Sequence, residues 1–317
     1  METLDDAYGN DHSGLPTLMG VPEGDLNALG DVAVAIIGAP IATPYPGFGL
    51  FSAEAPDAIR KGLAYDAPVI SHHDFDFDGS ISEDRFGRIV DCYDLPAHET
   101  DFTQNRTVIT DAVNQILDAG ACPIVIGGDD SVPTPVFQAF GNRDKQYTIL
   151  QIDAHIDWRD DVMGERWGLS STMRRASEMA HIERIVQVGM RSAGSARRGE
   201  YEDALAWGAE IITAQQLYTH HSLDLVLDHI PQGANVLITF DCDALDSSIM
   251  PAVMSPTPGG LSFWQTVGLI QGVAAKANLC GFNCVEFMPS RDTNGLAAQT
   301  AARIVLNAAA EMARVSR

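Results

Sequence analysis

The chain is poor in positive charge: Lys and Arg number 20 among 317 residues, against 43 Asp and Glu, and the formal net charge is −23 at pH 7. Nucleic acids and anionic membranes bind proteins largely through Lys and Arg, so this composition disfavours both as partners. A small cationic substrate is compatible with it, because an acidic entrance attracts cations. We therefore expect no nucleic acid and no membrane among the partners of this protein.

Long apolar runs and paired cysteines are also missing. No stretch approaches the roughly 20 apolar residues of a membrane span, and the N-terminus lacks the apolar run of a signal peptide. The five cysteines are odd in number and mostly lie in apolar, strand-like segments. They are typical of buried free thiols in a reducing compartment rather than of a disulfide framework. We expect a cytoplasmic protein.

Strand-like and helix-like segments alternate along most of the chain. The strand candidates are 32–38, 88–93, 123–126, 147–152, 184–188, 210–213, 235–240 and 279–287. The helix candidates are 56–63, 106–119, 202–207, 222–230, 262–276 and 295–312. Continuous apolar strands that alternate with helices indicate a parallel sheet covered on both faces. We therefore expect a three-layer α/β/α fold, with residues 1–28 partly ordered and residues 29–317 forming a single domain.

Two of the strand candidates are followed by clusters of acidic residues. Asp153, His155 and Asp157 follow one apolar run, and Asp241 and Asp243 follow another. Residues at i, i+2 and i+4 of an extended chain project the same way, so each cluster can converge on one point. Ligands of such sheets bind at the carboxyl ends of the strands. Four carboxylates and a histidine gathered there repel each other unless cations lie between them, which predicts a metal site.

A third strand candidate ends in the turn Gly127-Gly128-Asp129-Asp130-Ser131, which can add one more acid. Two divalent cations about 3.5–4 Å apart, bridged by a carboxylate and a water, satisfy such a ligand set. Oxygen-rich coordination with a histidine favours Mn²⁺ or a similar ion over a metal that prefers thiolates. An isolated acidic motif is usually a solvated strand end, but two such motifs beside an acidic turn favour the metal site.

These motifs resemble those of the ureohydrolases, the family that includes arginase and agmatinase. The resemblance is carried by the sequence Asp-Ala-His-x-Asp at 153–157, by Phe-Asp-x-Asp at 240–243, by the glycine turn, and by the segments 37–40, 55–60, 258–260, 285–289 and 294–297. It implies a parallel sheet of about eight strands in an α/β/α fold. It also implies a centre of two divalent metal ions, usually manganese, and assembly into trimers or hexamers. The implied reaction is hydrolysis of a guanidino compound to urea and an amine, by attack of a hydroxide that bridges the metals.

The resemblance assigns roles to individual residues. Asp153, His155, Asp157, Asp241 and Asp243 match metal ligands of the family, with Asp153 and Asp241 as the bridging pair.

Two of the matching acids have catalytic roles by the same resemblance. Glu286 matches the glutamate that hydrogen-bonds the guanidinium group, and Asp157 is expected to pass a proton toward the departing nitrogen. Asp246 matches the third acid of the second signature, with a role outside direct metal binding.

Three positions depart from the family pattern. Asp130 stands where the family has a histidine ligand, so five carboxylates would face two dications and leave the site at about −1. This change is expected to raise the pKa of the bridging water and to alter the metal preference, with Ni²⁺ as the alternative to Mn²⁺. The stretch 169–176 lacks the histidine that serves proton transfer in agmatinase-like relatives, and the loop 247–254 is bulkier and more apolar than usual.

The side chains expected around the pocket favour a small substrate. Trp158, Trp167, Met163, Met250 and Met254 fall in segments that border the pocket by resemblance. Aromatic and thioether groups favour a delocalised or alkylated cation over an amino-acid head group, although a single Trp or Met more often packs in a core. The expected substrates are guanidine, an alkylguanidine, a biguanide such as metformin, or an agmatine-like compound.

Two alternatives stay open at this stage. The chain can be a catalytically weak partner subunit of a hetero-oligomeric ureohydrolase, which the departures at Asp130 and Leu169 motivate. It can also hydrolyse another C–N bond, such as that of an amide or formimino group, although Glu286 favours a guanidinium group. The sequence leaves open Mn²⁺ or Ni²⁺, trimer or hexamer, and homo-oligomer or hetero-oligomer.

Overall fold

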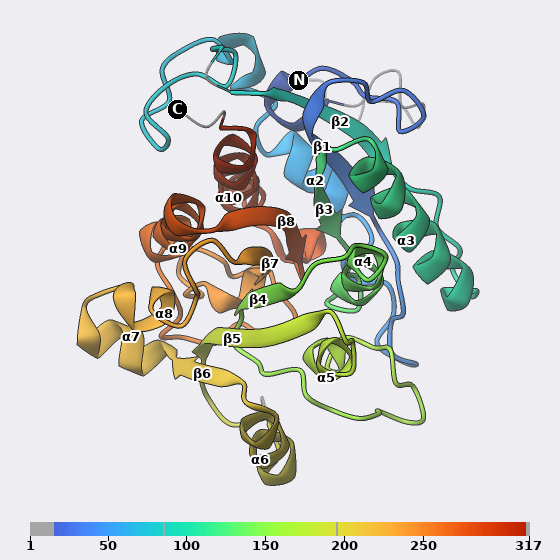
Figure 1. Cartoon of the computed structure of the whole chain (residues 1–317), viewed down its shortest axis with the longest axis vertical. Helices are drawn as coiled ribbons and strands as arrows, with labels where there is room; N and C mark the ends of the chain where they lie inside the picture. Colours follow the sequence, from blue (N-terminus) through green and yellow to red (C-terminus); the bar gives the residue numbers. More distant parts are fainter. Residues whose placement is uncertain (1–15, 85, 195, 315–317) are drawn as a thin grey trace.

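The computed structural model describes residues 16–84, 86–194 and 196–314. Their centre is an eight-stranded sheet with the order β2-β1-β3-β8-β7-β4-β5-β6. Every neighbouring pair of strands in this sheet is parallel. Figure 1 shows helices on both faces of the twisted sheet. The predicted three-layer α/β/α fold is therefore confirmed.

The strands lie close to their predicted positions. They are β1 (Val32–Ala39), β2 (Arg88–Asp94), β3 (Cys122–Gly127), β4 (Tyr147–Ile152), β5 (Ile182–Met190), β6 (Glu210–Thr213), β7 (Asn235–Asp241) and β8 (Asn278–Val285). Strand β8 ends two residues earlier than expected. The backbone of Glu286 has φ 67°, outside the extended region, so the strand stops before it.

The helices differ more from the prediction. They are α2 (Ala55–Lys61), α3 (Phe102–Asp118), α4 (Pro133–Phe140), α5 (Thr172–Ser177), α6 (Arg198–Trp207), α7 (Ala214–His220), α8 (Asp224–Leu227), α9 (Phe263–Lys276) and α10 (Leu296–Ala313). The sequence did not predict α4, α5 or α7. Helix α4 begins at Pro133, and proline fits the first turn of a helix, where its missing N–H is not needed. The predicted cap of α9 is confirmed, because the Ser262 hydroxyl accepts a hydrogen bond from the backbone N of Gln265 at 3.2 Å.

Each face of the sheet has its own hydrophobic core. Helices α2, α9 and α10 pack on one face, with buried residues such as Ile59, Leu269 and Val305. Helices α3, α4 and α5 pack on the other, with Ile116 and Phe137 among the buried residues. With both faces covered, only the ends of the strands are open to a ligand.

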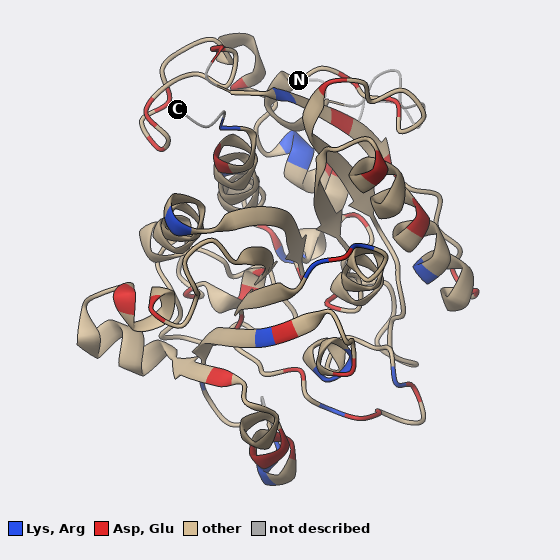
Figure 2. Cartoon of the chain, in the orientation of Figure 1, with Lys and Arg blue, Asp and Glu red and all other residues tan. Residues whose placement is uncertain are grey.

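The N-terminal segment expected to be partly ordered is only partly within the described residues. Residues 1–15 lie outside them, whereas Leu18 is fully buried and its backbone N donates to Asp91 Oδ2 at 3.0 Å. Acidic residues are spread over several sides of the molecule, and basic residues are fewer (Figure 2). Among the described residues, no helix combines the length and apolar composition that crossing a membrane requires.

Candidate metal centre

The acidic segments follow four neighbouring strands, β3, β8, β7 and β4. Parallel strands present their carboxyl ends at the same edge, so the residues after Gly127, Ile152, Asp241 and Val285 meet there. The sequence predicted which strands carry the acids. It did not predict that these four strands are adjacent.

The segment after β4 bends instead of remaining extended. Asp153 Oδ1 accepts a hydrogen bond from the backbone N of His155 at 2.6 Å, and Asp157 has φ 45°. The expectation of an extended chain over residues 153–157 is therefore wrong. A carboxylate that bonds to the backbone two residues ahead closes a tight turn, and this turn rather than strand alternation gathers the side chains.

The segment after β7 forms a similar turn. Asp241 Oδ1 accepts from the backbone N of Asp243 at 2.6 Å, and the chain continues as a short 3₁₀ turn, Cys242–Ala244. The two turns are joined, because the backbone N of Ala154 donates to Asp243 Oδ1 at 3.2 Å.

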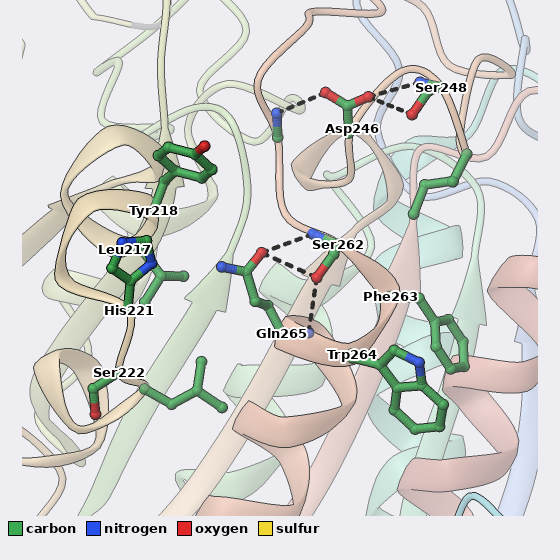
Figure 3. Close-up of a pocket in the computed structure, with 13 residues that line it drawn as sticks. Leu217, Tyr218, His221, Ser222, Asp246, Ser248, Ser262, Phe263, Trp264 and Gln265 are labelled. Carbon is green, nitrogen blue, oxygen red and sulfur yellow. Dashed lines mark hydrogen bonds between the residues drawn. The ribbon is translucent and has the colours of Figure 1, made fainter.

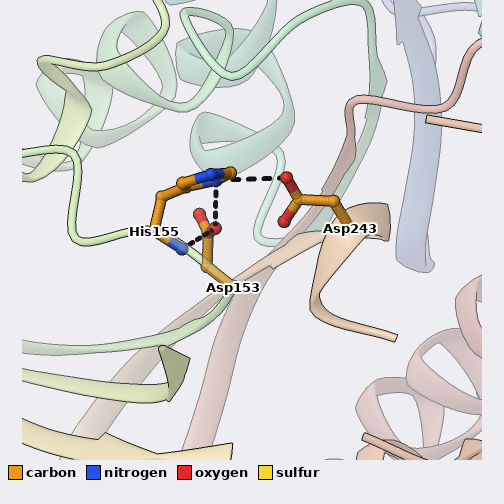
Figure 4. A group of neighbouring side chains, drawn as sticks. All are labelled: Asp153, His155 and Asp243. Atoms are coloured by element: carbon orange, nitrogen blue, oxygen red, sulfur yellow. Dashed lines mark hydrogen bonds and ion pairs between the residues drawn. The ribbon is translucent and has the colours of Figure 1, made fainter. Parts of the chain in front are cut away.

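Two groups of side chains have the geometry to hold a cation. In the first, shown in Figure 4, His155 Nδ1 lies 3.1 Å from Asp243 Oδ2 and 3.5 Å from Asp153 Oδ1. The second consists of Asp130, Asp153 and Asp241. Within each group the ligand atoms lie within 4.8 Å of one another. Asp153 belongs to both groups, so the arrangement suits two adjacent cations that share this carboxylate.

Asp130 tests whether these residues fit a metal. Its side chain is 2% exposed, and neither of its carboxylate oxygens has a hydrogen-bond partner among the described residues. Its backbone is held in place, because the backbone N donates to Glu286 Oε1 at 2.9 Å and the carbonyl accepts from the Thr172 hydroxyl. A buried carboxylate without a partner is costly unless a cation compensates it. The residues therefore fit a divalent metal ion.

Electrostatics lead to the same conclusion. Burial, followed by repulsion from neighbouring carboxylates, raises the pKa of Asp130, Asp241 and Glu286 well above the ordinary range. Burial raises the pKa of Asp153 and Asp157 as well. Each of these five carboxyls therefore binds a proton more tightly than an exposed acid does, and a dication would favour their charged forms.

The histidine at this site has the opposite environment. Burial opposes its charge, yet hydrogen bonds that the imidazole donates to Asp153 and Asp243 raise the pKa of His155 to about 12. Burial also works against ionisation of Asp243, but its hydrogen bond with His155 prevails and lowers the pKa of that carboxyl.

The site opens into a cavity of about 250 Å³. Besides the acidic cluster, its lining includes apolar side chains and a few polar ones: Tyr45, Phe48, Val162, Leu169, Met254, Arg159, Ser170 and Ser255. Asp157 and Glu286 also line it, and both have positive φ angles, 45° and 67°. Non-glycine residues in this region store roughly 1–3 kcal/mol of strain each and are concentrated at functional sites.

A larger groove of about 800 Å³ lies elsewhere, beside α9 and α7 (Figure 3). Its acidic residue is Asp246, whose oxygens accept hydrogen bonds from Ser248 N at 3.0 Å and Gly259 N at 2.7 Å. The hydrogen bonds from Ser248 lower the pKa of Asp246 to about 2. Asp246 therefore organises the loop after β7, and the groove lacks the ligand groups of the smaller cavity.

Three residues expected at the substrate pocket do not line the cavity. Trp158 is 2% exposed and packs on Trp207 in the core beneath α5 and α6, with ring centroids 6.0 Å apart. Met250 is fully buried in the opposite core. Trp167 lies against the Arg106 guanidinium at 5.3 Å. Trp158 was expected at the pocket from the family resemblance, and alternation along an extended chain would itself place it on the face opposite Asp157.

Several cavity residues were missed by sequence reasoning. Tyr45 and Phe48 lie in an irregular segment after β1, and no motif marks them. Arg159 has a usable signal, because it follows Asp157 by two residues and is a cation in a segment rich in acids. Of the Trp and Met residues expected there, Met254 lines the cavity, whereas Met163 is 78% exposed.

Known proteins are similar to this chain in sequence and in fold. The model of the arginase family matches residues 32–310. Guanidinobutyrase of Pseudomonas aeruginosa is 27% identical over 212 residues, which cover 65% of this chain and 66% of that protein. A mitochondrial arginase of Medicago truncatula is 29% identical over 302 residues, covering 91% of this chain and 85% of that protein. The solved structure of arginase from Medicago truncatula has a TM-score of 0.77 and 28% identity, with 90% of each chain covered.

Proposed function

This chain belongs to the arginase family of ureohydrolases, and from that premise we propose that it hydrolyses a C–N bond of a small guanidino compound. The products would be urea or a substituted urea, together with an amine. The observation that carries the proposal is the pair of ligand groups that share Asp153, at the edge of a 250 Å³ cavity.

The residues that would hold two divalent metal ions are already gathered. Asp153, His155 and Asp243 would hold one ion, and Asp130 and Asp241 would hold the other together with Asp153. Asp157 belongs to neither group but lies beside Asp153, because Gln151 Nε2 donates to Asp153 Oδ2 at 2.7 Å and to Asp157 Oδ2 at 2.6 Å. When bound, such ions supply a hydroxide near neutral pH by lowering the pKa of a shared water.

The metal is proposed to be Mn²⁺ or Ni²⁺. Carboxylate ligands suit Mn²⁺, whereas a site with additional imidazole suits Ni²⁺ better. Asp130 in place of histidine makes the second group entirely carboxylate. Loading the metal-free chain with each ion in turn and measuring urea formation decides between them.

The side chains of the cavity would bind and orient the substrate. Glu286 would accept hydrogen bonds from the guanidinium group, and its backbone N, which donates to Gly128 O at 2.9 Å, fixes its position. Asp157 would take up a proton at its carboxylate and deliver it to the departing nitrogen. The apolar lining from Tyr45, Phe48 and Leu169 would limit water around the reacting atoms.

The lining supports a short substrate without a second positive charge. Tyr45, Phe48, Leu169 and Met254 offer aromatic and aliphatic surface, which suits an alkylguanidine or a biguanide such as metformin. Arg159 is a cation in the lining and would repel the ammonium tail of an agmatine-like compound.

A second candidate class is the guanidino acids. The Arg159 guanidinium is only loosely held, with Nε 3.9 Å from Glu200 Oε1 and Nη2 3.5 Å from the Gly194 carbonyl. A substrate carboxylate would be a better partner for it than either group. The similarity to guanidinobutyrase supports this class.

A panel of guanidino compounds tests the proposal and separates the two classes. Guanidine, N,N-dimethylguanidine, metformin, 4-guanidinobutyrate and agmatine are each incubated with the Mn²⁺-loaded and Ni²⁺-loaded protein. Urea, substituted urea and amine are then quantified. Absence of hydrolysis with every compound and both metals would contradict the proposal, and Glu286→Gln is expected to abolish any turnover while the protein keeps its metal.

Two variants test whether Arg159 binds the carboxylate of a guanidino acid. If the substrate is a guanidino acid, Arg159→Leu raises KM for 4-guanidinobutyrate and leaves KM for dimethylguanidine unchanged. Arg166→Leu serves as the control, because Arg166 is an exposed cation of the same segment, paired with Asp160 outside the cavity lining. Equal effects of both variants would exclude a specific role for Arg159.

The alternative remains that this chain is a catalytically weak partner subunit of a hetero-oligomer. A subunit with little activity would not need side chains arranged to bind metal ions. In this chain Asp153 belongs to two groups of possible metal ligands. The metal content of the chain expressed alone separates the two possibilities.

A further inference from the structure

Two buried glutamines lie in the sheet just before the acidic cluster. Gln151 is on β4 and Gln187 is its neighbour on β5, directly opposite in the strand register. Both side chains are fully buried. An amide in the interior of a parallel sheet is costly unless it is hydrogen-bonded, and apolar residues usually fill such positions.

The hydrogen bonds of Gln151 lead to the candidate metal ligands. Its Nε2 donates to Asp153 Oδ2 at 2.7 Å and to Asp157 Oδ2 at 2.6 Å. One amide group therefore spans both carboxylates of the segment after β4. It uses both of its N–H donors to do so.

Gln187 fixes the orientation of that amide. Its Nε2 donates to Gln151 Oε1 and, at 2.9 Å, to the Ile156 carbonyl. Because the Gln151 oxygen already receives this bond, the amide cannot rotate to present oxygen to the carboxylates without losing it. The Ile156 contact also ties Gln187 to the turn that carries Asp157.

The same row of the sheet contains a natural comparison. Thr239 on β7 pairs with Gln151 on its other side and is 1% exposed. Its hydroxyl has no hydrogen-bond partner among the described residues. A buried polar side chain in this row of the sheet therefore does not necessarily hydrogen-bond a carboxylate of the cluster. Gln151 does so, and Gln187 holds Gln151 in place.

A neutral donor has a specific advantage beneath a cation site. Lys or Arg in place of Gln151 would hold the carboxylates through a full positive charge and would compete with a metal ion for them. An amide orders the same oxygens without adding charge. Groups that hydrogen-bond metal ligands orient them and contribute to affinity for the ion.

We propose that Gln151 and Gln187 are positioning residues for the metal centre. Gln151 holds Asp153 and Asp157 at the spacing that two cations need, and Gln187 acts through Gln151. This inference rests on the proposed function only in that the acidic cluster binds divalent metal ions.

The test compares Gln151→Met, Gln187→Met and the double variant with the unmodified chain. Thr239→Val is the matched control, because it removes a buried polar atom of the same row that touches no carboxylate. The affinity for Mn²⁺ is measured by competition with a chromophoric chelator, without substrate. The rise in melting temperature on adding Mn²⁺ to chelator-treated protein is measured in parallel, since this difference cancels any general loss of stability.

The expected loss of Mn²⁺ affinity in Gln151→Met is roughly 10- to 100-fold, and the rise in melting temperature should shrink with it. Gln187→Met should weaken affinity less. The double variant should bind no more weakly than Gln151→Met, because residues that act in series are not additive. Thr239→Val should bind Mn²⁺ as the unmodified chain does.

Each contrary result overturns one part of the proposal. Unchanged affinity in Gln151→Met, or an equal loss in Thr239→Val, overturns the positioning role. If the losses of affinity in the two single variants multiply in the double variant, Gln187 does not act through Gln151. Unchanged affinity in Gln187→Met leads to the same conclusion. The Gln187→Met variant provides the test if Gln151→Met does not fold. Weakened affinity without hydrolysis of any guanidino compound would refute the proposed function and leave this inference intact.

Discussion

At the scale of single residues, the account depends on buried acids that lie close together, among them Asp130, whose carboxylate has no hydrogen-bond partner among the described residues. The sequence predicted that Asp153, His155, Asp241 and Asp243 follow strands, since apolar runs end directly before them. It did not predict the surroundings of Trp158. That side chain packs on Trp207 in the core, and such contacts between segments far apart in the chain are not encoded in a local pattern.

Asp130→Asn is the residue-scale prediction for the metal centre. The substitution removes one negative charge from a carboxylate that has no hydrogen-bond partner among the described residues. We expect bound Mn²⁺ to fall from about two ions toward one per chain, because the second group loses an anionic ligand. Inductively coupled plasma mass spectrometry measures the metal content.

The control for that experiment is Asp161→Asn. Asp161 is an exposed acid whose Oδ1 accepts from the backbone N of Gly164 at 3.1 Å in a surface turn. It should leave the metal content unchanged. A full complement of metal in Asp130→Asn would remove Asp130 from the ligand set.

At the scale of elements, the arrangement of the site follows from strand order. The sequence predicted the strands well because their apolar, β-branched runs are continuous and bounded by turns. The adjacency of β3, β8, β7 and β4 results from crossovers between segments far apart in sequence. No local pattern encodes these contacts. Helix α4 was also not predicted, and it is short and begins at a proline.

We predict that the turn after β3 requires the backbone of Gly128 to lie close to the backbone of Pro40. A Cβ added at Gly128 would lie 2.1 Å from the Pro40 carbonyl oxygen, so the turn that carries Asp130 would have to move. Gly128→Ala should lower stability by roughly 1–3 kcal/mol, the usual cost of overpacking. It should also weaken Mn²⁺ binding, as chemical denaturation and chelator competition will measure.

Gly199→Ala provides the comparison. Gly199 is an exposed residue of α6, and an added Cβ would meet no atom within 4 Å. Its stability and metal affinity should stay unchanged or rise slightly. Equal behaviour of the two alanine variants would show that the turn tolerates displacement.

At the scale of the whole molecule, the formal net charge is −23, and most of the acidic residues are spread over several sides of the protein (Figure 2). A smaller group of acids is buried at one edge of the sheet, where a cation can offset their charge. Trimeric or hexameric assembly, expected from the family resemblance, stays a prediction that the native mass in solution will test.

The stability of the metal-free protein should depend on pH in a defined direction. Burial raises the pKa of Asp130, Asp241 and Glu286 above the unfolded value of about 4. Their contribution to stability is complete below that pH and is lost as the pH rises through the raised values. The gap between the melting temperatures of metal-loaded and chelator-treated protein should therefore widen from pH 5 toward pH 8, roughly the range over which most proteins are stable.

Melting curves recorded across this range in matched buffers will measure the gap. A gap that stays constant with pH would mean that these carboxyls do not exchange protons for metal ions.

The most direct test of the central claim is anomalous diffraction from crystals of the chain expressed alone and loaded with Mn²⁺. The account predicts two anomalous peaks at the carboxyl ends of β4 and β7, one contacting His155 and Asp243, the other Asp130 and Asp241, with Asp153 contacting both. A structure without peaks at this edge, or with Asp153 in contact with solvent alone, would contradict it.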